Sequence, residues 1–292
     1  MQLTIISLNY KNPELTIQSM NSVYVAYKEQ FEKKQFEYIL VDNYSNDTSS
    51  SLLSKAVGEY SGFHFLESSI NNGFGAGCNL GAQKGKGEYL LFINNDTQVK
   101  GNGIVDMVEY LKAHEEIAIL GGQLQNFNGT NQSSVGTFYT LFQVLFLLLG
   151  FQRFGITDKN PKAPSRVDWV KGALYMIRKN VFDKLEGFDE KIFMYTEDME
   201  LCYRAKKKGY VTYFFPTEGI FHKEHGSSNR SFAIIHIYKG IIYFYKKHMP
   251  KWKFTLVHFL LTLKATIFVI LGKITGNAYL RSTYAQALEV LR

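Results

Sequence analysis

A chain of 292 residues with 46% hydrophobic and 15% aromatic residues can bury a large core, which excludes a largely disordered protein. Its two cysteines, Cys78 and Cys202, show no CxxC or Cys/His spacing, which excludes a disulfide framework and a structural zinc site and favours a reducing compartment. The formal charge is +7, but residues 230–292 alone carry ten Lys/Arg against one acid, Glu289, so the positive charge is concentrated in that segment.

Short apolar runs alternate with helical patterns over the first 120 residues. The expected strands are residues 3–8, 37–41, 63–66, 89–93 and 117–120. The expected helices between them are residues 14–31, 48–57, 75–84 and 104–113. This alternation predicts an α/β fold with a mostly parallel central sheet that is covered by helices on both faces. The opening Met-Gln-Leu-Thr-Ile lacks a basic region followed by an apolar one, so we expect no secretory signal.

The pattern changes in the middle of the chain. The apolar stretch 138–151 is too short to span a bilayer, and it fits either a buried helix or a membrane-facing insertion. The α/β pattern then resumes with an expected strand at 167–177, a helix at 196–208 and a strand at 210–215. Residues 232–248 place basic and polar side chains opposite Ile, Tyr and Phe, as is typical of a basic amphipathic helix in a membrane interface.

The last apolar run, 254–272, is nearly long enough to cross a membrane. Lys264 lies at its middle, and a lysine at the bilayer centre costs ~3 kcal/mol, so a helix or hairpin lying on the surface is favoured. We therefore expect an α/β domain over residues 1–230 and a basic, hydrophobic, helical membrane-association segment over residues 231–292. Basic and aromatic residues interleave in this segment, but its long aliphatic runs favour anionic lipid, and we expect no nucleic-acid partner.

Polar residues follow three of the expected strands, at the edge where ligands bind in parallel sheets. Asn9 ends the first strand, Asp42 the second, and Asn94-Asn95-Asp96 follows the buried strand 89–93. Each group alone is compatible with ordinary turn chemistry. Three at one sheet edge indicate a ligand site. A carboxylate there suits Mg²⁺, which keeps several waters and takes further ligands from the phosphates of a substrate.

Two later segments carry further candidate chemistry. His222 and His225 lie beside a Gly-Ser-Ser turn after the strand 210–215, which suits a metal site of oxygen and imidazole ligands. Glu197 and Asp198 begin a helix, and the structural interpretation is that Thr196 caps this helix and its dipole favours the acids. The alternative makes Asp198 a general base beside a pocket of aromatic residues.

The glycines at 73, 75 and 77 invite comparison with a dinucleotide-binding motif. Their spacing is not GxGxxG and they follow the third expected strand, so a Rossmann dehydrogenase is excluded. A glycine-rich loop that opens a helix still suits close approach by a phosphate or a sugar.

Three segments in fixed order carry a more specific signal. Trp169-Val170-Lys171-Gly172-Ala173, Gly187-Phe188-Asp189-Glu190 and residues 193–204, Phe-Met-Tyr-Thr-Glu-Asp-Met-Glu-Leu-Cys-Tyr-Arg, resemble family 2 glycosyltransferases of the GT-A fold, especially rhamnosyltransferase-like members from bacteria. The resemblance covers about residues 3–230, which would make the first domain a GT-A glycosyltransferase domain.

The resemblance implies roles for individual residues. The donor site would be formed by Leu8, Asn9, Asp42, Asn72, Gly75, Asn79, Asn94 and Asn95, with Asp42 bonding the edge of a pyrimidine base. The acceptor site would be bordered by Trp169, Gly172, Ala173 and Glu197. Asp96 would bind a divalent metal, Mg²⁺ or Mn²⁺, with His222 as the second protein ligand, and Asp198 would be the catalytic base. Glu200 replaces a more usual Asp, a change that we expect to matter little.

The implied activity is inverting, metal-dependent transfer of a sugar from a nucleotide-diphosphate donor to a hydroxyl of a lipid-linked glycan in surface polysaccharide synthesis. The favoured donor is dTDP-rhamnose, with UDP-sugars next, and the enzyme would lie peripherally on the cytoplasmic face of the cell membrane. A sugar nucleotidyltransferase would carry a Gly-rich, basic loop after the first strand, where this chain has Asn9-Tyr10-Lys11-Asn12-Pro13. A non-enzymatic membrane-interaction protein would leave the strand-end carboxylates unexplained.

Overall fold

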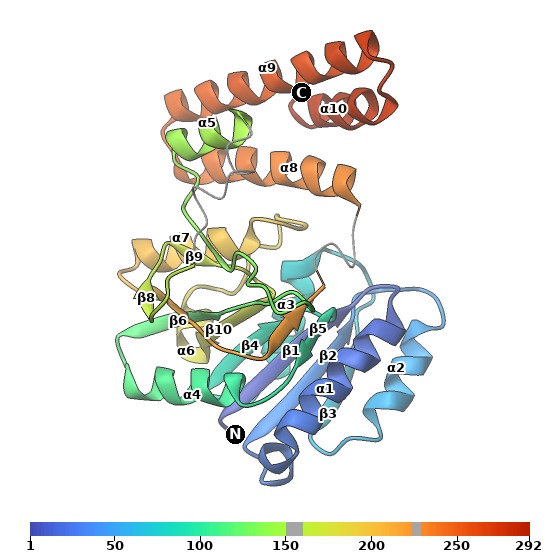
Figure 1. The fold of residues 1–292 in the computed structure, drawn as a ribbon, viewed down its shortest axis with the longest axis vertical. Coiled ribbons are helices and arrows are strands. Elements are labelled where there is room, and N and C mark those ends of the chain that lie inside the picture. Colours follow the sequence, from blue (N-terminus) through green and yellow to red (C-terminus); the bar gives the residue numbers. More distant parts are fainter. Residues whose placement is uncertain (150–159, 224–228) are drawn as a thin grey trace.

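The computed structural model describes residues 1–149, 160–223 and 229–292. A sheet of eight strands in the order β3-β2-β1-β4-β10-β6-β11-β8 forms the centre of the molecule (Figure 1). The strands are β1 Leu3–Asn9, β2 Phe36–Asp42, β3 Phe63–Glu67, β4 Tyr89–Ile93, β6 Ile117–Gly122, β8 Ser165–Arg166, β10 Leu174–Arg178 and β11 Val211–Phe215. β1 to β4 are mutually parallel, and β10 runs antiparallel between β4 and β6. The predicted mostly parallel sheet is confirmed.

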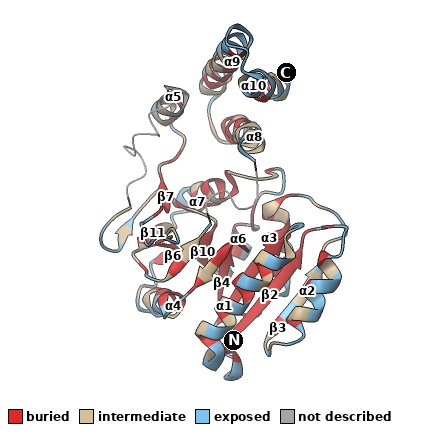
Figure 2. Cartoon of the chain, turned by 45° about the vertical axis from the view of Figure 1, so that its right-hand side comes forward, coloured by how far each residue is buried: buried red, intermediate tan, exposed pale blue. Residues whose placement is uncertain are grey.

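Helices cover both faces of this sheet because side chains alternate along each strand. On β1, Leu3 and Ile5 belong to one buried cluster, whereas Ile6 and Leu8 belong to another. The first cluster is closed by α1 Pro13–Glu32, α2 Ser49–Val57 and α4 Gly103–Ala113. The second is closed by α3 Phe74–Lys84, α6 Lys179–Lys184 and α7 Glu197–Lys207. Figure 2 shows the strands buried between these helices.

Two short ribbons lie beside the main sheet. β5, Thr97–Val99, pairs antiparallel with β12, Ile220–His222, and His222 lies opposite Thr97. β7, Val135–Gly136, pairs with β9, Trp169–Val170. The first ribbon is important for the site. Its register places His222 opposite Thr97, which directly follows Asp96.

The single strand expected at 167–177 is wrong. The structure divides this region into β9 and β10, with a turn at 171–173 between them, and β8 precedes it. Leu174 N donates to Lys171 O at 3.2 Å and closes the turn, while Gly172 N donates to Asp198 Oδ2 at 2.9 Å. The continuous apolar pattern hides this turn because its glycine is held by a residue 26 positions later in the chain.

The C-terminal region forms three helices, α8 Arg230–His248, α9 Lys251–Ile274 and α10 Ala278–Val290. Figure 1 shows α9 and α10 as the outermost layer, with α8 between them and the sheet domain. α10 was not predicted, although Asn277 is a regular N-cap whose side chain accepts a hydrogen bond from Leu280 N. Pro250 separates α8 from α9.

α8 shares its core with the sheet domain. Four of its side chains are almost fully buried and belong to the same cluster as the strand residues Phe92 and Tyr175; they are Tyr238, Ile241, Phe244 and Tyr245. The division expected at residue 230 therefore does not coincide with a break in packing.

The apolar stretch 138–151 contains α5, Leu141–Leu149, and its last two residues lie outside the described part of the chain. Val144 is buried, but Phe142 is 75% exposed and Leu145 is 40% exposed. Of the two alternatives for this stretch, the exposed apolar side chains favour the outward-facing one. α5 packs beside α9 (Figure 1).

Candidate functional site

One chain of hydrogen bonds ties three strand ends together. Asn95 Nδ2 donates to Thr16 Oγ1 at 2.8 Å, and this hydroxyl donates to Asn9 Oδ1 at 2.8 Å. Asn9 Nδ2 donates to Asp42 Oδ1 at 2.7 Å, and Ser45 Oγ donates to the same oxygen at 2.6 Å. The expectation that Asn9, Asp42 and Asn95 meet at one sheet edge is confirmed. Thr16 and Ser45 were not predicted as members.

Asp42 is completely buried in this network. Besides the bonds to Oδ1, its Oδ2 accepts a hydrogen bond from Ser45 N at 2.9 Å. The carboxylate therefore holds the ends of β1 and β2 in place and does not face solvent. Direct contact between Asp42 and a base edge would use the remaining acceptor site of Oδ2 and would require this buried side chain to become accessible.

Asp96 and His222 approach one another as the two expected metal ligands. Asp96 Oδ1 lies 3.2 Å from His222 Nε2, and Asn94 Nδ2 lies 3.4 Å from the same ring nitrogen. Asp96 is only 4% exposed, and its Oδ1 accepts no hydrogen bond from a described residue. A buried carboxylate oxygen that lacks a donor and faces an imidazole nitrogen fits a divalent cation. Within the described residues no cluster of three or more such ligands occurs, so further ligands would come from substrate and water.

The turn at 171–173 connects Asp198 to the segment 94–96, which contains Asp96. Gly172 N donates to Asp198 Oδ2 at 2.9 Å, and Met199 N donates to Asp198 Oδ1 at 2.8 Å. The next residue, Ala173, accepts a hydrogen bond from Asn94 N at 3.3 Å. Two adjacent residues of one turn thus orient Asp198 and the segment that leads to Asp96.

Glu197 and Asp198 share a desolvated environment. Burial raises the pKa of Glu197 to about 8, with the neighbouring charge of Asp198 as the second cause. Glu197 Oε2 finds no hydrogen-bond donor among the residues that the structure covers. Burial also raises the pKa of Asp198, and the backbone donors Gly172 and Met199 oppose this shift. Glu197 is therefore mostly protonated at neutral pH, and Asp198 is the better hydrogen-bonded carboxylate of the two.

Replacing Glu197 with glutamine is expected to stabilise the protein more at high pH than at low pH. A raised folded-state pKa gives Glu197 a stabilising contribution that is complete below its unfolded pKa and is lost as the pH rises through about 8. Gln cannot ionise and avoids that loss. The gain in Tm over the parent should be at least about 2–4 °C larger near pH 8 than near pH 5. Differential scanning fluorimetry measures it, with the exposed Glu115→Gln as control. A gain independent of pH would contradict the raised pKa.

The backbone before α7 is unusual. Tyr195 and Thr196 both adopt left-handed conformations, with φ of 62° and 98°. Such residues carry strain that surrounding contacts must hold, and they are frequent at functional sites. Thr196 makes no side-chain capping bond to the described helix, so the structural interpretation of Thr196 as a side-chain cap is wrong. The strain lies directly beside the Glu197–Asp198 pair.

The glycine-rich loop packs tightly against this segment. Gly73 has φ of 97°, and a Cβ there would lie 2.1 Å from the carbonyl oxygen of Phe193. Phe74 N donates to that same oxygen at 2.8 Å. A Cβ on Gly75 would lie 2.9 Å from Phe188 Cβ. The start of α3 and the segment before α7 are therefore in direct backbone contact, which explains the need for glycine at these positions.

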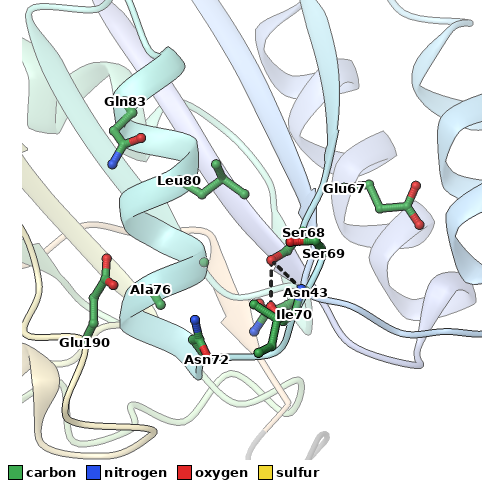
Figure 3. Close-up of a pocket in the computed structure, with 11 residues that line it drawn as sticks. Asn43, Glu67, Ser68, Ser69, Ile70, Asn72, Ala76, Leu80, Gln83 and Glu190 are labelled. Carbon is green, nitrogen blue, oxygen red and sulfur yellow. Dashed lines mark hydrogen bonds between the residues drawn. The ribbon is translucent and has the colours of Figure 1, made fainter.

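On the other side of α3, a cavity of about 310 Å³ opens between that helix and the loop that follows β3 (Figure 3). Asn72, one of the expected donor-site residues, lines it together with Asn43, Ser68 and Glu190. Asp96, Asp198 and His222 are not among the described residues that line it. The cavity thus borders the site at Asn72 but is separate from the candidate catalytic groups.

Three expected site residues have structural partners instead. Asn79 Oδ1 accepts a hydrogen bond from Phe188 N at 2.9 Å, and Asn79 Nδ2 donates to Phe188 O at 2.9 Å. Asn79 therefore fixes the segment 187–190. Trp169 Nε1 donates to Thr137 O at 3.0 Å, and its ring packs over Gly136. Leu8 is buried against Gly77. Their proposed ligand contacts stay predictions.

Glu200 is the centre of a buried ionic cluster. It is fully buried, and its Oε2 accepts from Arg204 Nε at 2.8 Å. Its Oε1 lies 2.7 Å from Lys247 Nζ and 2.9 Å from His248 Nε2, both on α8. Lys247 also binds Asp189 Oδ2 at 2.5 Å. The expectation that Glu instead of Asp matters little at position 200 is not supported, because the longer side chain lies at the hub that joins α7 to α8.

Comparisons with known proteins identify the family of the chain. Residues 4–185 match the family model described as Glycosyl transferase family 2. The chain is 26% identical over 199 residues to rhamnosyltransferase WbbL of Escherichia coli, a match that covers 64% of this chain and 74% of that protein. It is 24% identical over 241 residues to N-acetylglucosaminyl-diphospho-decaprenol L-rhamnosyltransferase of Mycobacterium tuberculosis, covering 74% of this chain and 76% of that protein.

Solved structures show the same fold. GalNAc-T7 with UDP, GalNAc and Mn²⁺ superposes with a TM-score of 0.60 at 16% identity, over 84% of this chain and 50% of that one. The mannosyltransferase PcManGT of Pyrobaculum calidifontis, in complex with GDP-Man and Mn²⁺, superposes with a TM-score of 0.59 at 12% identity, over 99% of this chain and 85% of that one. The chain therefore belongs to glycosyl transferase family 2, as a rhamnosyltransferase-like glycosyltransferase with the GT-A fold.

Proposed function

We propose that this glycosyltransferase moves a sugar, with rhamnose favoured, from a nucleotide-diphosphate donor to a hydroxyl of a lipid-linked glycan with inversion at the anomeric carbon. The observation that carries the proposal is the turn at 171–173, which bonds both Asp198 and the segment 94–96, where Asp96 faces His222 of β12. The names of two relatives, both rhamnosyltransferases, support the donor sugar. One of those names includes a decaprenol-linked diphosphate, which supports a lipid-linked acceptor.

Asp198 is the proposed general base. Its two oxygens are oriented by Gly172 N and Met199 N, and each retains a lone pair for a proton from the acceptor hydroxyl. As that hydroxyl oxygen bonds to the anomeric carbon, the bond to the nucleoside diphosphate breaks on the opposite face of the sugar. One carboxylate suffices for such a displacement, whereas a retaining hydrolase uses two that flank the bond. Protonated Glu197 beside it keeps a second negative charge from competing for the proton.

Asp96 and His222 are the proposed holders of a divalent metal, Mg²⁺ or Mn²⁺. Such an ion offsets negative charge on the departing diphosphate. The Mn²⁺ present in two structures of the same fold supports this assignment. Asn94 borders the same ring nitrogen, and Asn95 is bonded into the strand-end network, so both orient the segment that carries Asp96.

Removing divalent metal is expected to abolish transfer. Loss of several kcal/mol of charge stabilisation corresponds to at least about a 100-fold fall in rate. Release of nucleoside diphosphate from dTDP-rhamnose and from a panel of UDP- and GDP-sugars should be measured with excess EDTA and after adding back Mn²⁺ or Mg²⁺. The Asp96→Asn variant should lose the response to added metal while keeping its Tm within a few degrees. Full activity in excess chelator, with any donor of the panel, would refute metal dependence; no turnover of any donor with metal present would refute the transferase assignment.

α9 supports the proposed membrane contact. By length and composition this helix can cross a membrane, and a seam of apolar side chains, most of them well exposed, runs along its whole length at helical spacing: Trp252, Leu256, Phe259, Leu263, Ile267, Ile270 and Ile274. Lys253 and Lys264 lie on one flank of this seam and Lys273 on the other. The opposite face is occupied, because Val257, Leu261 and Ala265 pack inward.

A helix with one face packed, the other apolar, and lysines along both flanks suits an in-plane position at a bilayer surface, with the lysine heads reaching the headgroups. This arrangement also explains Lys264, which lies at the boundary between the exposed seam and the packed face, with its Nζ 5.8 Å from the ring of the core-packed Phe268. We therefore assign membrane association to α9 and α10 with the exposed side of α5, and place α8 in the catalytic unit. Peripheral attachment at the cytoplasmic face is the matching location for a nucleotide-sugar donor.

A further inference from the structure

We propose that Gln132 is a positioning residue that keeps the proton of His222 on Nδ1 and so turns the lone pair of Nε2 toward Asp96. This inference deepens the proposed function, because it rests on the metal site assigned above to Asp96 and His222. Gln132 lies in the region where no regular pattern was expected, 90 residues before His222.

The orientation of the Gln132 amide is fixed by its surroundings. Its Nε2 donates to the carbonyl oxygen of His222 at 2.8 Å and to Asn126 Oδ1 at 2.8 Å. A carbonyl oxygen can only accept, so the nitrogen of the amide must lie on that side. The side-chain oxygen then faces the ring, 2.9 Å from His222 Nδ1. Gln132 is only 4% exposed, so water does not compete effectively for these bonds.

The amide oxygen in turn decides the state of the ring. Oε1 of Gln132 has no proton to give, so the ring must donate from Nδ1. A neutral imidazole carries one N–H, which leaves Nε2 with its lone pair. This lone pair faces Asp96 Oδ1 at 3.2 Å. Two acceptors at this distance repel unless a cation lies between them.

The separation of these two atoms matches that of neighbouring ligands on one ion. Ligands that each lie about 2.0–2.2 Å from a divalent metal at a right angle are about 3 Å apart. Metal-binding histidines commonly donate their second ring nitrogen to an oxygen that fixes the tautomer, and loss of that partner lowers metal affinity about 10- to 100-fold. In this protein, Oε1 of Gln132 is the oxygen that faces the second ring nitrogen, Nδ1 of His222.

The backbone around Gln132 holds it rigidly. Gln132 N donates to Leu124 O at 2.8 Å, and Gln132 O accepts from Gln123 Nε2 at 2.8 Å and from Asn160 Nδ2 at 2.6 Å. His222 N donates to Gln125 O at 2.9 Å, so the same segment binds the backbone of both partners. The ring and its amide partner are therefore part of one connected unit.

The test compares the parent with Gln132→Leu, Gln132→Glu and Gln125→Leu. Gln125 is a matched control because its side chain bonds Gly219 and Asn131. Long-range ¹H–¹⁵N spectra of the metal-free protein, at a pH where the rings are neutral, report which ring nitrogen carries the proton, and His222→Ala assigns the signal. We expect Nδ1–H in the parent, in Gln125→Leu and in Gln132→Glu, which keeps an acceptor. In Gln132→Leu we expect the proton on Nε2, where Asp96 accepts it.

Binding of Mn²⁺ alone, measured by electron paramagnetic resonance, supplies a second readout. We expect Gln132→Leu to weaken it about 10- to 100-fold and Gln125→Leu to leave it unchanged. A parent ring with its proton on Nε2, or with protons on both nitrogens, would overturn the inference. So would a Gln132→Leu variant with the tautomer and the Mn²⁺ affinity of the parent. The spectra need neither metal nor donor. A failure of this inference can therefore be distinguished from a failure of the proposed function in the chelation experiment.

Discussion

An Asp198→Asn variant is expected to transfer sugar about 100- to 10,000-fold more slowly than the parent, which is the range that a general base contributes. Asparagine keeps the size of the side chain but cannot take a proton from the acceptor hydroxyl. Its single oxygen also leaves one of the two donors, Gly172 N or Met199 N, without an acceptor. Single-turnover transfer with saturating donor measures the effect. Donor binding, measured by calorimetry, should change by less than about tenfold, because no donor contact is assigned to Asp198.

Glu197→Gln is the matched control for that experiment. The pKa of Glu197 is raised to about 8, so the residue is mostly neutral at pH 7, and an uncharged amide of the same shape reproduces this state. We expect this variant to keep transfer within about tenfold of the parent. The raised pKa of Asp198 further predicts that the parent loses activity on acidification at a higher pH than an ordinary Asp would. Near-normal transfer by Asp198→Asn, or an equal loss in Glu197→Gln, would remove Asp198 as the base.

A chain that ends at Asn229 is expected to unfold or aggregate, whereas one that ends at Met249 is expected to fold. The shorter chain lacks α8 and thus four almost fully buried side chains, Tyr238, Ile241, Phe244 and Tyr245. Burying each large apolar side chain contributes about 1.5–3 kcal/mol, so their sum is comparable to the whole stability of about 5–15 kcal/mol of a typical domain. Removal of Lys247 and His248 also leaves the buried Glu200 carboxylate without two of its hydrogen-bond partners, which destabilises the fold.

The longer truncation separates folding from membrane contact. It keeps the Glu200 cluster and removes α9 and α10, whose buried side chains, among them Val257, Leu261 and Tyr284, belong to the same cluster as those of α8. We therefore expect a lower Tm than that of the full chain but still a cooperative transition, together with loss of co-sedimentation with anionic liposomes. Thermal unfolding and liposome sedimentation of the three chains provide the comparison. A stable chain ending at Asn229 would show that α8 does not belong to the catalytic unit. Undiminished liposome binding by the chain ending at Met249 would place the membrane contact elsewhere.

Elements that are buried on both faces were predicted well from the sequence. The strand Tyr89–Ile93 is buried along its whole length and reads as a continuous apolar run, so its bounds agree with the expectation. The alternation of such runs with amphipathic helices was sufficient to predict the sheet and the meeting of Asn9, Asp42 and Asn95 at one edge. Parallel strands bring their carboxyl ends together whatever the details of the loops.

Features that depend on distant contacts were not predicted. The turn at 171–173 is stabilised by Asp198, and its apolar neighbours hide it in the pattern. Gln132 lies in irregular backbone, and only its approach to His222 reveals a role. Glu200 was expected to be a replacement of little consequence, but its partners Lys247 and His248 lie on a helix that was assigned to the membrane segment. In each case the deciding bond joins residues that no local periodicity relates.

The contact between Gly240 and Thr196 has a geometric consequence. A Cβ on Gly240 would lie 2.1 Å from Thr196 Oγ1, so α8 rests directly on the strained residue two positions before Asp198. Packed helix axes lie about 8–10 Å apart, so α8 and α9 together would form a spacer of fixed thickness between the proposed membrane face and Asp198, the proposed base. On the proposed membrane face, an acceptor is then selected by reach: its lipid-linked head must be long enough to present a hydroxyl at the height of Asp198.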